Sequence, residues 1–125
     1  MAETNNKKIL IVEDDKDFLF ILQKKFTAEG FQVVNAQDGE AGANMAEMEN
    51  PDLIISDILL PKMNGTEMAK KIKALKPETK IIFLTNVKDI DYIGDEIKSG
   101  GYDCLIKSDL HIEDIVAKVK NKLGV

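Results

Sequence analysis

Arginine is absent from this sequence, and cysteine, histidine and proline are scarce. All 17 basic side chains are lysines, against 22 acidic side chains, which gives a net charge of −5. Because direct readout of DNA or RNA relies on arginine and on a basic face, this balance argues against a nucleic-acid-binding domain. The single cysteine, Cys104, excludes an internal disulfide and a cysteine-based zinc site, and it fits a reducing cytoplasm.

Long apolar runs are also missing. No apolar stretch exceeds a handful of residues, so the sequence predicts neither a membrane-spanning helix nor a signal peptide. The chain has 125 residues, of which 44% are hydrophobic, and this is enough for one domain with a single core. Residues 1–6 are polar and are expected to form a disordered tail, with a single domain over residues 7–125.

Short apolar runs alternate with amphipathic segments five times along the chain. The runs of strand length lie at 9–12, 31–34, 53–55, 81–84 and 104–106. Most are continuously apolar, which is typical of strands that helices cover on both faces, whereas the second is mixed and is expected at a sheet edge. The alternation predicts a three-layer α/β domain with a parallel sheet and right-handed crossovers.

The predicted helices have apolar side chains at helical spacing. The segment 38–50 has the weakest pattern, since Gly42 costs about 1 kcal/mol relative to alanine. The third helix is expected to stop before Pro77, and Ser108 or Asp109 is expected to cap the last. The expected apolar faces are Phe18, Leu19, Ile21, Leu22 and Phe26 in the first helix, Met68, Ile72 and Leu75 in the third, Ile90, Ile93 and Ile97 in the fourth, and Ile112, Ile115, Val116, Val119 and Leu123 in the last.

Polar side chains follow four of the predicted strands. Glu13 and Asp14 follow the first and Asp57 follows the third, at the carboxyl ends where parallel α/β sheets bind ligands. Three converging carboxylates repel one another unless a cation neutralises them, and Mg²⁺ is the simplest candidate. Thr85 and Lys107 follow the fourth and fifth strands, and a hydroxyl and an ammonium can hold a phosphoryl group. A carboxylate can itself accept that group as an aspartyl phosphate.

Five short motifs occur in order at these positions. They are Ile11-Val12-Glu13-Asp14, Ser56-Asp57-Ile58-Leu59-Leu60-Pro61, Met63-Asn64-Gly65, Leu84-Thr85 and Leu105-Ile106-Lys107. With these motifs the chain resembles, over residues 7–123, the receiver domain of two-component response regulators, of which the stand-alone chemotaxis-type response regulator is one. The resemblance implies a flavodoxin-like, doubly wound (βα)5 fold with strand order 2-1-3-4-5.

The resemblance also implies a role for each residue. Asp57 is the expected phosphoacceptor, which attacks a phosphohistidine on a sensor histidine kinase or a histidine phosphotransfer protein. Thr85 is expected to hydrogen-bond the phosphoryl group, and Lys107 to pair with one of its oxygens. The expected ligands of Mg²⁺ are Asp14, Glu13 mostly through water, Asp57 and the backbone carbonyl of Leu59.

By the same resemblance, the expected function is that of a stand-alone cytoplasmic switch that catalyses only its own phosphorylation and dephosphorylation. It would signal to an unknown protein target as a monomer or a weak, phosphorylation-dependent dimer, without binding nucleic acid or membrane. The expected contact surface comprises the fourth helix, the fifth strand and the fifth helix, and suits a mixed-charge partner. Its charges are Asp89, Asp91, Asp95 and Glu96 against Lys118, Lys120 and Lys122.

Three positions depart from the family pattern. Cys104 replaces the usual aromatic residue three positions before the lysine, which affects the conformational readout rather than the phosphorylation chemistry. Ser108 replaces the proline that commonly follows the lysine, so we expect a trans bond there. Asn86 replaces the usual alanine or glycine after Thr85. The larger side chain is expected to slow access to the phosphoryl site or to change dephosphorylation.

Other functions remain open at this point. One is a receiver-like scaffold that acts without phosphorylation. Another is a metal-dependent phosphohydrolase, although such an enzyme needs a second acid where Leu59 stands. A third is a mononucleotide binder, but the acids of Glu13-Asp14-Asp15 would repel a phosphate where that fold needs a phosphate-binding loop. The only histidine, His111, is read as a surface residue and not as a phosphate carrier.

Overall fold

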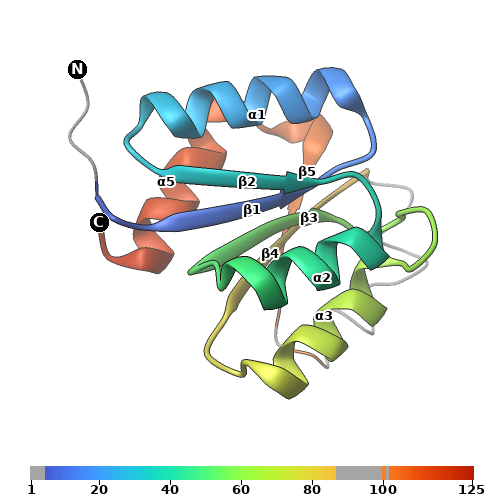
Figure 1. The fold of residues 1–125 in the computed structure, drawn as a ribbon. Coiled ribbons are helices and arrows are strands. Elements are labelled where there is room, and N and C mark those ends of the chain that lie inside the picture. Colours follow the sequence, from blue (N-terminus) through green and yellow to red (C-terminus); the bar gives the residue numbers. More distant parts are fainter. Residues whose placement is uncertain (1–4, 87–99, 101) are drawn as a thin grey trace.

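The fold is a parallel five-stranded sheet with helices on both faces, as the sequence pattern predicts (Figure 1). The computed structural model describes residues 5–86, 100 and 102–125. The strands are β1 (Lys8–Val12), β2 (Gln32–Ala36), β3 (Leu53–Asp57), β4 (Lys80–Thr85) and β5 (Asp103–Ile106). Their order is β2-β1-β3-β4-β5, so the prediction that the second strand lies at an edge is confirmed.

The helices that the structure describes begin and end close to the predicted positions. They are α1 (Lys16–Ala28), α2 (Gly39–Glu49), α3 (Gly65–Leu75) and α5 (Ile112–Leu123), with a short 3-10 turn at Lys107–Asp109. The predicted fourth helix, with its isoleucines and the acids of the expected contact surface, lies outside the described residues, as do residues 1–4 of the expected tail. Within the part of the chain that the structure describes, no helix has the length and apolarity that a membrane crossing requires.

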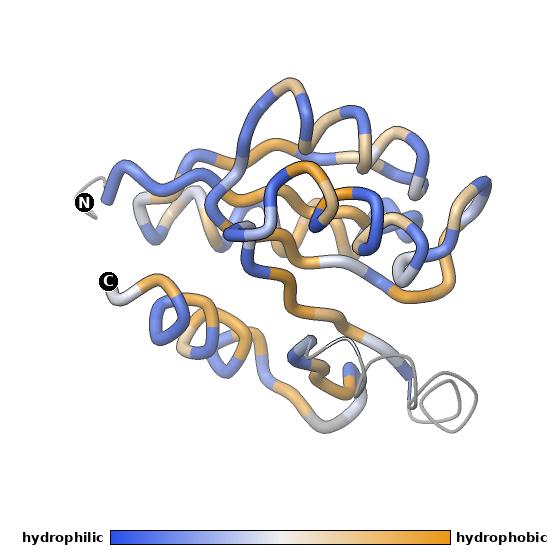
Figure 2. Tube along the Cα trace, turned by 90° about the horizontal axis from the view of Figure 1, so that it is seen from below, coloured by the Kyte–Doolittle hydropathy of each residue, from blue (hydrophilic) through white to orange (hydrophobic). Residues whose placement is uncertain are grey.

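Alternating side chains of the strands feed two hydrophobic clusters, one on each face of the sheet. The α1–α5 cluster contains Ile9 and Ile11 of β1 together with large side chains such as Phe26 of α1. The α2–α3 cluster contains Leu10 and Val12 of the same strand. Figure 2 shows the result: the strands in the middle of the sheet are largely apolar, whereas apolar and polar residues alternate within the turns of the helices.

Helix α2 reaches the sheet with small residues, which explains its weak sequence pattern. Ala43 and Ala46 are buried, and so is Gly42. A Cβ at Gly42 would lie 2.6 Å from Met68 Sδ and 3.0 Å from Val12 Cγ2, so this glycine permits a close approach of helix to sheet. The free-energy cost of glycine in a helix is thus offset by packing.

Three details of the helix predictions are wrong. Ile21 is 51% exposed because α1 packs through the stripe of Leu22 and its helical neighbours, and a residue one position earlier points about 100° away. Leu75 is 61% exposed because it is the last residue of α3 and lies beyond the last turn that contacts the sheet.

The third error concerns the cap of α5. The N-cap is His111, not Ser108 or Asp109, which belong to the preceding 3-10 turn. The backbone N–H of His111 donates to Asp114 Oδ2 at 3.0 Å, so an acid of the first helical turn stabilises this helix start. His111 is exposed, as predicted.

Candidate functional site

The candidate site lies at the carboxyl ends of the central strands, and the alternation of the strands brings its side chains together. Glu13 continues the side of β1 that carries Ile9 and Ile11 in the α1–α5 cluster. Asp57 does the same after Ile55 of β3, and Lys107 after Leu105 of β5. Because side chains of equal parity leave a strand on the same face, these three groups point to one side of the sheet rim.

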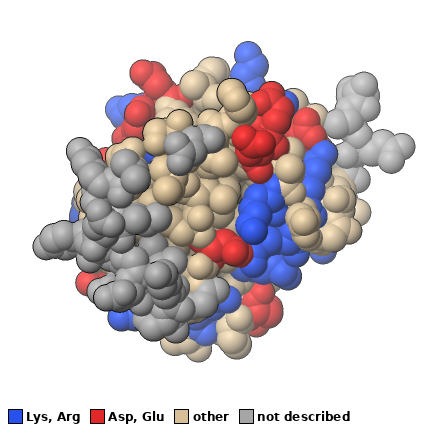
Figure 3. Space-filling model, turned by 180° about the vertical axis from the view of Figure 1, so that it is seen from behind, with Lys and Arg blue, Asp and Glu red and all other residues tan. Residues whose placement is uncertain are grey.

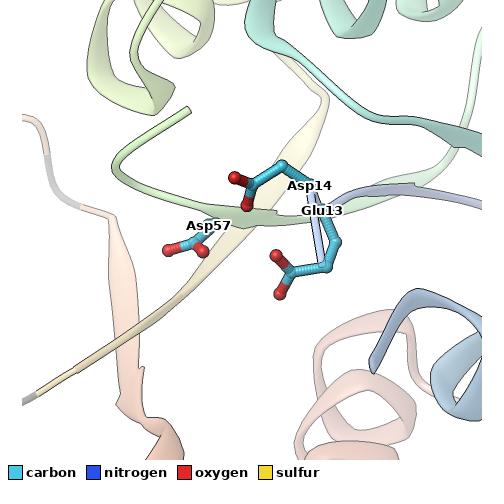
Figure 4. A group of neighbouring side chains, drawn as sticks. All are labelled: Glu13, Asp14 and Asp57. Carbon is cyan, nitrogen blue, oxygen red and sulfur yellow. The ribbon is translucent and has the colours of Figure 1, made fainter. Parts of the chain in front are cut away.

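Lys107 joins two of the acids. Its Nζ donates to Glu13 Oε1 at 2.8 Å and to Asp57 Oδ2 at 3.0 Å. Carboxylate oxygens of Glu13, Asp14 and Asp57 all lie within 4.8 Å of one another. Figure 4 shows these carboxylates converging from the end of β1 and the end of β3. The structure therefore brings four of the predicted site residues into one cluster.

Backbone donors fix the two acids that Lys107 contacts. Asp57 Oδ1 accepts from the N–H of Ile58 at 2.9 Å, and Glu13 Oε2 accepts from the N–H of Asp15 at 3.2 Å. Each carboxylate therefore has one oxygen on the backbone and the other on the ammonium. Such charge-assisted contacts are stronger than neutral ones, so both carboxylates are held in orientation before any ligand arrives.

Burial and pairing shift the proton affinities of this cluster in one direction. Burial raises the pKa of Glu13 to about 6, although its hydrogen bond from Lys107 acts in the opposite sense. Burial alone would lower the pKa of Lys107, but its hydrogen bonds to Glu13 and Asp57 outweigh that cost and raise the pKa. Lys107 is therefore charged at neutral pH, and burial makes ionisation of Glu13 costly even beside this ammonium.

The donor set fits a hard cation such as Mg²⁺. Within the described residues it consists of carboxylate oxygens alone, from buried Glu13, exposed Asp14 and half-buried Asp57. Magnesium binds through a few carboxylates and retains several waters, so a cluster with an exposed member suits it.

The loop after β3 carries the carbonyl of Leu59 and is held by backbone contacts. The N–H of Gly65 donates to the Ile58 carbonyl at 2.6 Å, and the N–H of Gly39 donates to the Pro61 carbonyl at 3.2 Å. A Cβ at Gly39 would collide with the Met63 carbonyl, so α2 begins directly against this loop. Sequence reasoning missed Gly39, because nothing local shows that the start of α2 touches residues 61–63.

Thr85 lies at the end of the neighbouring strand and is fully buried. It pairs in register with Ile106 of β5, and Leu84 before it pairs with Asp57 of β3. Its hydroxyl donates to the carbonyl of Asn86 at 3.3 Å. The structure thus places Thr85 at the same rim as Asp57, with its hydroxyl directed to its own backbone.

The family departures have simple structural outcomes. Cys104 is half-buried and packs against the α2–α3 cluster. Tyr102 packs against the same cluster, and its ring meets Phe83 edge to face at 5.3 Å. Every peptide bond within the described residues is trans, including that between Lys107 and Ser108, as predicted.

The comparison with known families turns this geometry into a family assignment. The model of the response regulator receiver domain matches residues 9–120 of the chain. This chain belongs to the response regulator receiver family. The order of its strands is that of a receiver domain.

Relatives of this receiver domain differ in length. The sporulation initiation phosphotransferase F of Bacillus subtilis is 30% identical over 118 residues, and the match covers 94% of each chain. The receiver spans only 36% and 44% of two transcriptional regulators that it also matches, at 40% and 30% identity.

Solved structures support the same fold. A CheY-like receiver domain from Methanospirillum hungatei is 31% identical, with a TM-score of 0.87 and coverage of 96% of this chain and 95% of that one. The response regulator TrrA of Thermotoga maritima, solved with Mg²⁺ and BeF, is 29% identical, with a TM-score of 0.80 and coverage of 92% and 97%.

Proposed function

We propose that this receiver accepts a phosphoryl group on Asp57 from the phosphohistidine of a sensor histidine kinase or a histidine phosphotransfer protein. One observation carries the proposal: Asp57 Oδ2 lies 3.0 Å from an ammonium and within a cluster of two further carboxylates. A nucleophilic carboxylate beside a cation and a set of hard-metal ligands is the equipment for phosphoryl transfer.

In the transfer, a carboxylate oxygen of Asp57 forms the new bond to phosphorus. The bond from phosphorus to the donor's imidazole nitrogen breaks, and its electron pair stays on that nitrogen, which then takes up a proton. Lys107 is already at hydrogen-bond distance from Asp57, so it can follow the negative charge onto a phosphoryl oxygen. Thr85 would contribute its hydroxyl by turning away from the Asn86 carbonyl.

A bound Mg²⁺ would be held by Asp14, Asp57, the carbonyl of Leu59 and, mostly through water, Glu13. When bound, it would neutralise negative charge on the phosphoryl oxygens. Two facts support this part of the proposal: the carboxylates fit a hard cation, and the related regulator TrrA was solved with Mg²⁺ and BeF. We therefore expect phosphorylation to need a divalent cation.

The proposed switch acts through protein contacts in the cytoplasm, as a stand-alone module without nucleic-acid or membrane binding. The match to a phosphotransferase over 94% of each chain supports a role in phosphoryl transfer. Reversible phosphorylation would change which partner the domain contacts, and the domain would catalyse no reaction except its own phosphorylation and dephosphorylation.

The α5 part of the proposed contact surface carries paired charges. Seen from behind, lysines form one patch bordered by carboxylates (Figure 3). Lys118 and Lys122 pair with Asp103 of β5, and Lys120 pairs with Glu29, the C-cap of α1, at 2.6 Å. A partner here would meet neutralised pairs, which favours specificity over strong attraction.

Intact-mass analysis after incubation with Mg²⁺ and a small acyl phosphate tests the proposal. We expect a gain of one phosphoryl group in the wild type and none in Asp57→Asn. Asp17→Asn is the matched control, because Asp17 is an exposed acid in the first turn of α1, close in sequence to the acidic pair. A folded wild type that binds Mg²⁺ but gains no phosphoryl group would contradict the proposal and favour the scaffold function.

A further inference from the structure

The ring of Phe18 lies against the ammonium of Lys107. Nζ is 5.0 Å from the ring centroid, within the roughly 6 Å at which an aromatic face attracts a cation. The same nitrogen donates to Glu13 and Asp57 at 2.8 and 3.0 Å. The ammonium is therefore bounded by two carboxylates and one aromatic face.

The start of α1 fixes where this ring lies. Asp15 caps the helix, and its Oδ1 accepts from the N–H of Asp17 at 3.0 Å and from the N–H of Phe18 at 3.3 Å. The Phe18 ring also packs against the α1–α5 cluster. Because Asp15 follows the acidic pair directly, a single capped turn connects the ring rigidly to the carboxylates.

A lysine side chain is long and flexible, so Lys107 depends on neighbouring groups to keep its ammonium in one place. Its four-carbon stem is flexible, and an ammonium is a compact point charge without the directional fork of a guanidinium. The side chain of Lys107 is only 20% exposed, so the ring replaces water around it. A cation–π contact strengthens when the cation is desolvated, as it is here.

We propose that Phe18 is a positioning residue for the reaction of Asp57: its aromatic face holds the Lys107 ammonium beside Asp57, where an oxygen of the transferred phosphoryl group would lie. The consequence for reaction rate rests on the proposed function. The placement of Lys107 does not, and it can be measured in the unphosphorylated protein. The proposal requires an aromatic face at position 18, not merely an apolar side chain.

Two substitutions separate the aromatic face from apolar packing. Phe18→Leu retains an apolar side chain against the α1–α5 cluster but removes the ring, whereas Phe18→Tyr retains the ring face. The first readout is the proton NMR shift of the Lys107 ε-methylene, which the ring current moves upfield in the wild type. We expect this upfield shift to be lost in Phe18→Leu and kept in Phe18→Tyr.

The second readout is the rate of phosphorylation by a small acyl phosphate with Mg²⁺, since such a donor makes no protein–protein contact. We expect Phe18→Leu to react about fivefold more slowly, the factor that corresponds to one cation–π contact, and Phe18→Tyr to recover most of the rate. Phe20→Leu is the control on the same helix, because Phe20 is 65% exposed, and it should react at the wild-type rate. Urea unfolding shows that each variant is folded.

The outcomes decide the proposal. A Phe18→Leu variant with the wild-type ε-methylene shift and rate would overturn it, and so would equal slowing in the leucine and tyrosine variants, which would indicate a steric role. If the wild type gains no phosphoryl group, the proposed function fails, but the NMR comparison still decides whether Phe18 places the ammonium.

Discussion

The two faces of the sheet support the site by different means. The α1–α5 face contributes side chains: Glu13, Asp57 and Lys107 continue its strand alternation, and Phe18 of its first helix lies over the ammonium. The α2–α3 face contributes backbone, because the loop that carries the Leu59 carbonyl is held by N–H donors. Its helix α2 approaches closely through glycine and alanine, whereas α1 packs through large side chains.

This difference determines which substitutions each face tolerates. A face that packs through large side chains loses stability when they are shortened, because cavities form. A face that packs through close backbone approach is destabilised where an added carbon would collide with backbone atoms. On the first face, shortening a core side chain away from the rim should alter stability with little change at the carboxylates. On the second, a carbon added where α2 meets the loop should move the Leu59 carbonyl.

The largest effect is expected at Phe26, at the centre of the α1–α5 cluster. It is fully buried and meets Phe31 edge to face at 5.6 Å. Phe26→Ala should lower the free energy of unfolding by about 4 kcal/mol, measured by urea denaturation. The control Phe20→Ala, on the exposed side of α1, should change it by less than about 0.5 kcal/mol. A loss of less than about 1 kcal/mol at Phe26 would show that this face does not depend on side-chain volume.

Gly39→Ala should produce the next largest effect, on the opposite face. Its new Cβ would collide with the Met63 carbonyl, which is backbone and cannot rotate away. We expect a loss of about 2 kcal/mol in unfolding free energy and weaker Mg²⁺ binding by isothermal titration calorimetry.

Gly42→Ala is the matched control for Gly39. Its Cβ would lie 2.6 Å from Met68 Sδ and 3.0 Å from Val12 Cγ2, which are side-chain atoms and can move where the Met63 carbonyl cannot. Alanine also gains about 1 kcal/mol of helix propensity, so stability should stay within about 1 kcal/mol of wild type. Equal Mg²⁺ affinity in the Gly39 variant and the wild type would show that α2 does not support the loop.

A pH-dependent effect is expected at Glu13. Burial raises its pKa in the fold to about 6 from 4.5, so the folded state binds more protons than the unfolded state between these values. Stability therefore falls as pH rises from about 4.5 to 6, by about 2 kcal/mol from this group in the absence of divalent cations. In Glu13→Gln this pH-dependent loss of stability should disappear. The variant should be about 1 kcal/mol more stable than wild type at pH 7, because the weaker contact of glutamine with Lys107 offsets part of the stability gained by removing the buried charge.

Urea denaturation at several pH values in EDTA measures this difference. Glu40→Gln, which alters an exposed acid of α2, should follow the wild-type pH profile. If the unfolding free energy of Glu13→Gln depended on pH as that of wild type does, ionisation of the buried Glu13 would not lower the stability of the fold.

The sequence predicted the site side chains on the α1–α5 face better than the backbone contacts on the α2–α3 face. Strand ends and the residues that follow them can be read from the apolar runs, so Glu13, Asp57 and Lys107 could be placed at one rim. The contact of Gly39 with residues 61–63 is a meeting of two distant segments, and no local pattern encodes it. The spacing of apolar residues in α1 predicted Phe18 as a core residue. It does pack against the core, but its ring also contacts Lys107, and helical spacing cannot reveal this second contact.

The helix errors have a similar origin. Leu75 satisfies the helical spacing, yet exposure at a helix end depends on where the tertiary contact stops. His111 became the cap because the chain first makes a 3-10 turn after β5, which periodicity does not reveal. Periodicity thus predicted the elements and their faces, whereas their ends depended on packing.

The smallest predicted effect concerns Lys62, in the loop that the α2–α3 face supports. Its φ of 69° lies in the left-handed region, which costs a side chain with a Cβ about 1 kcal/mol. Lys62→Gly should raise the unfolding free energy by about 0.5 kcal/mol, because relief of strain exceeds the loss of the long ion pair between exposed Lys62 and Asp38 at 3.8 Å. Lys70→Gly, at an exposed position within α3, should instead lower it by about 1 kcal/mol. If both glycines destabilise equally in urea denaturation, the loop is not strained at Lys62, and hydrogen bonds alone hold the backbone that carries the Leu59 carbonyl.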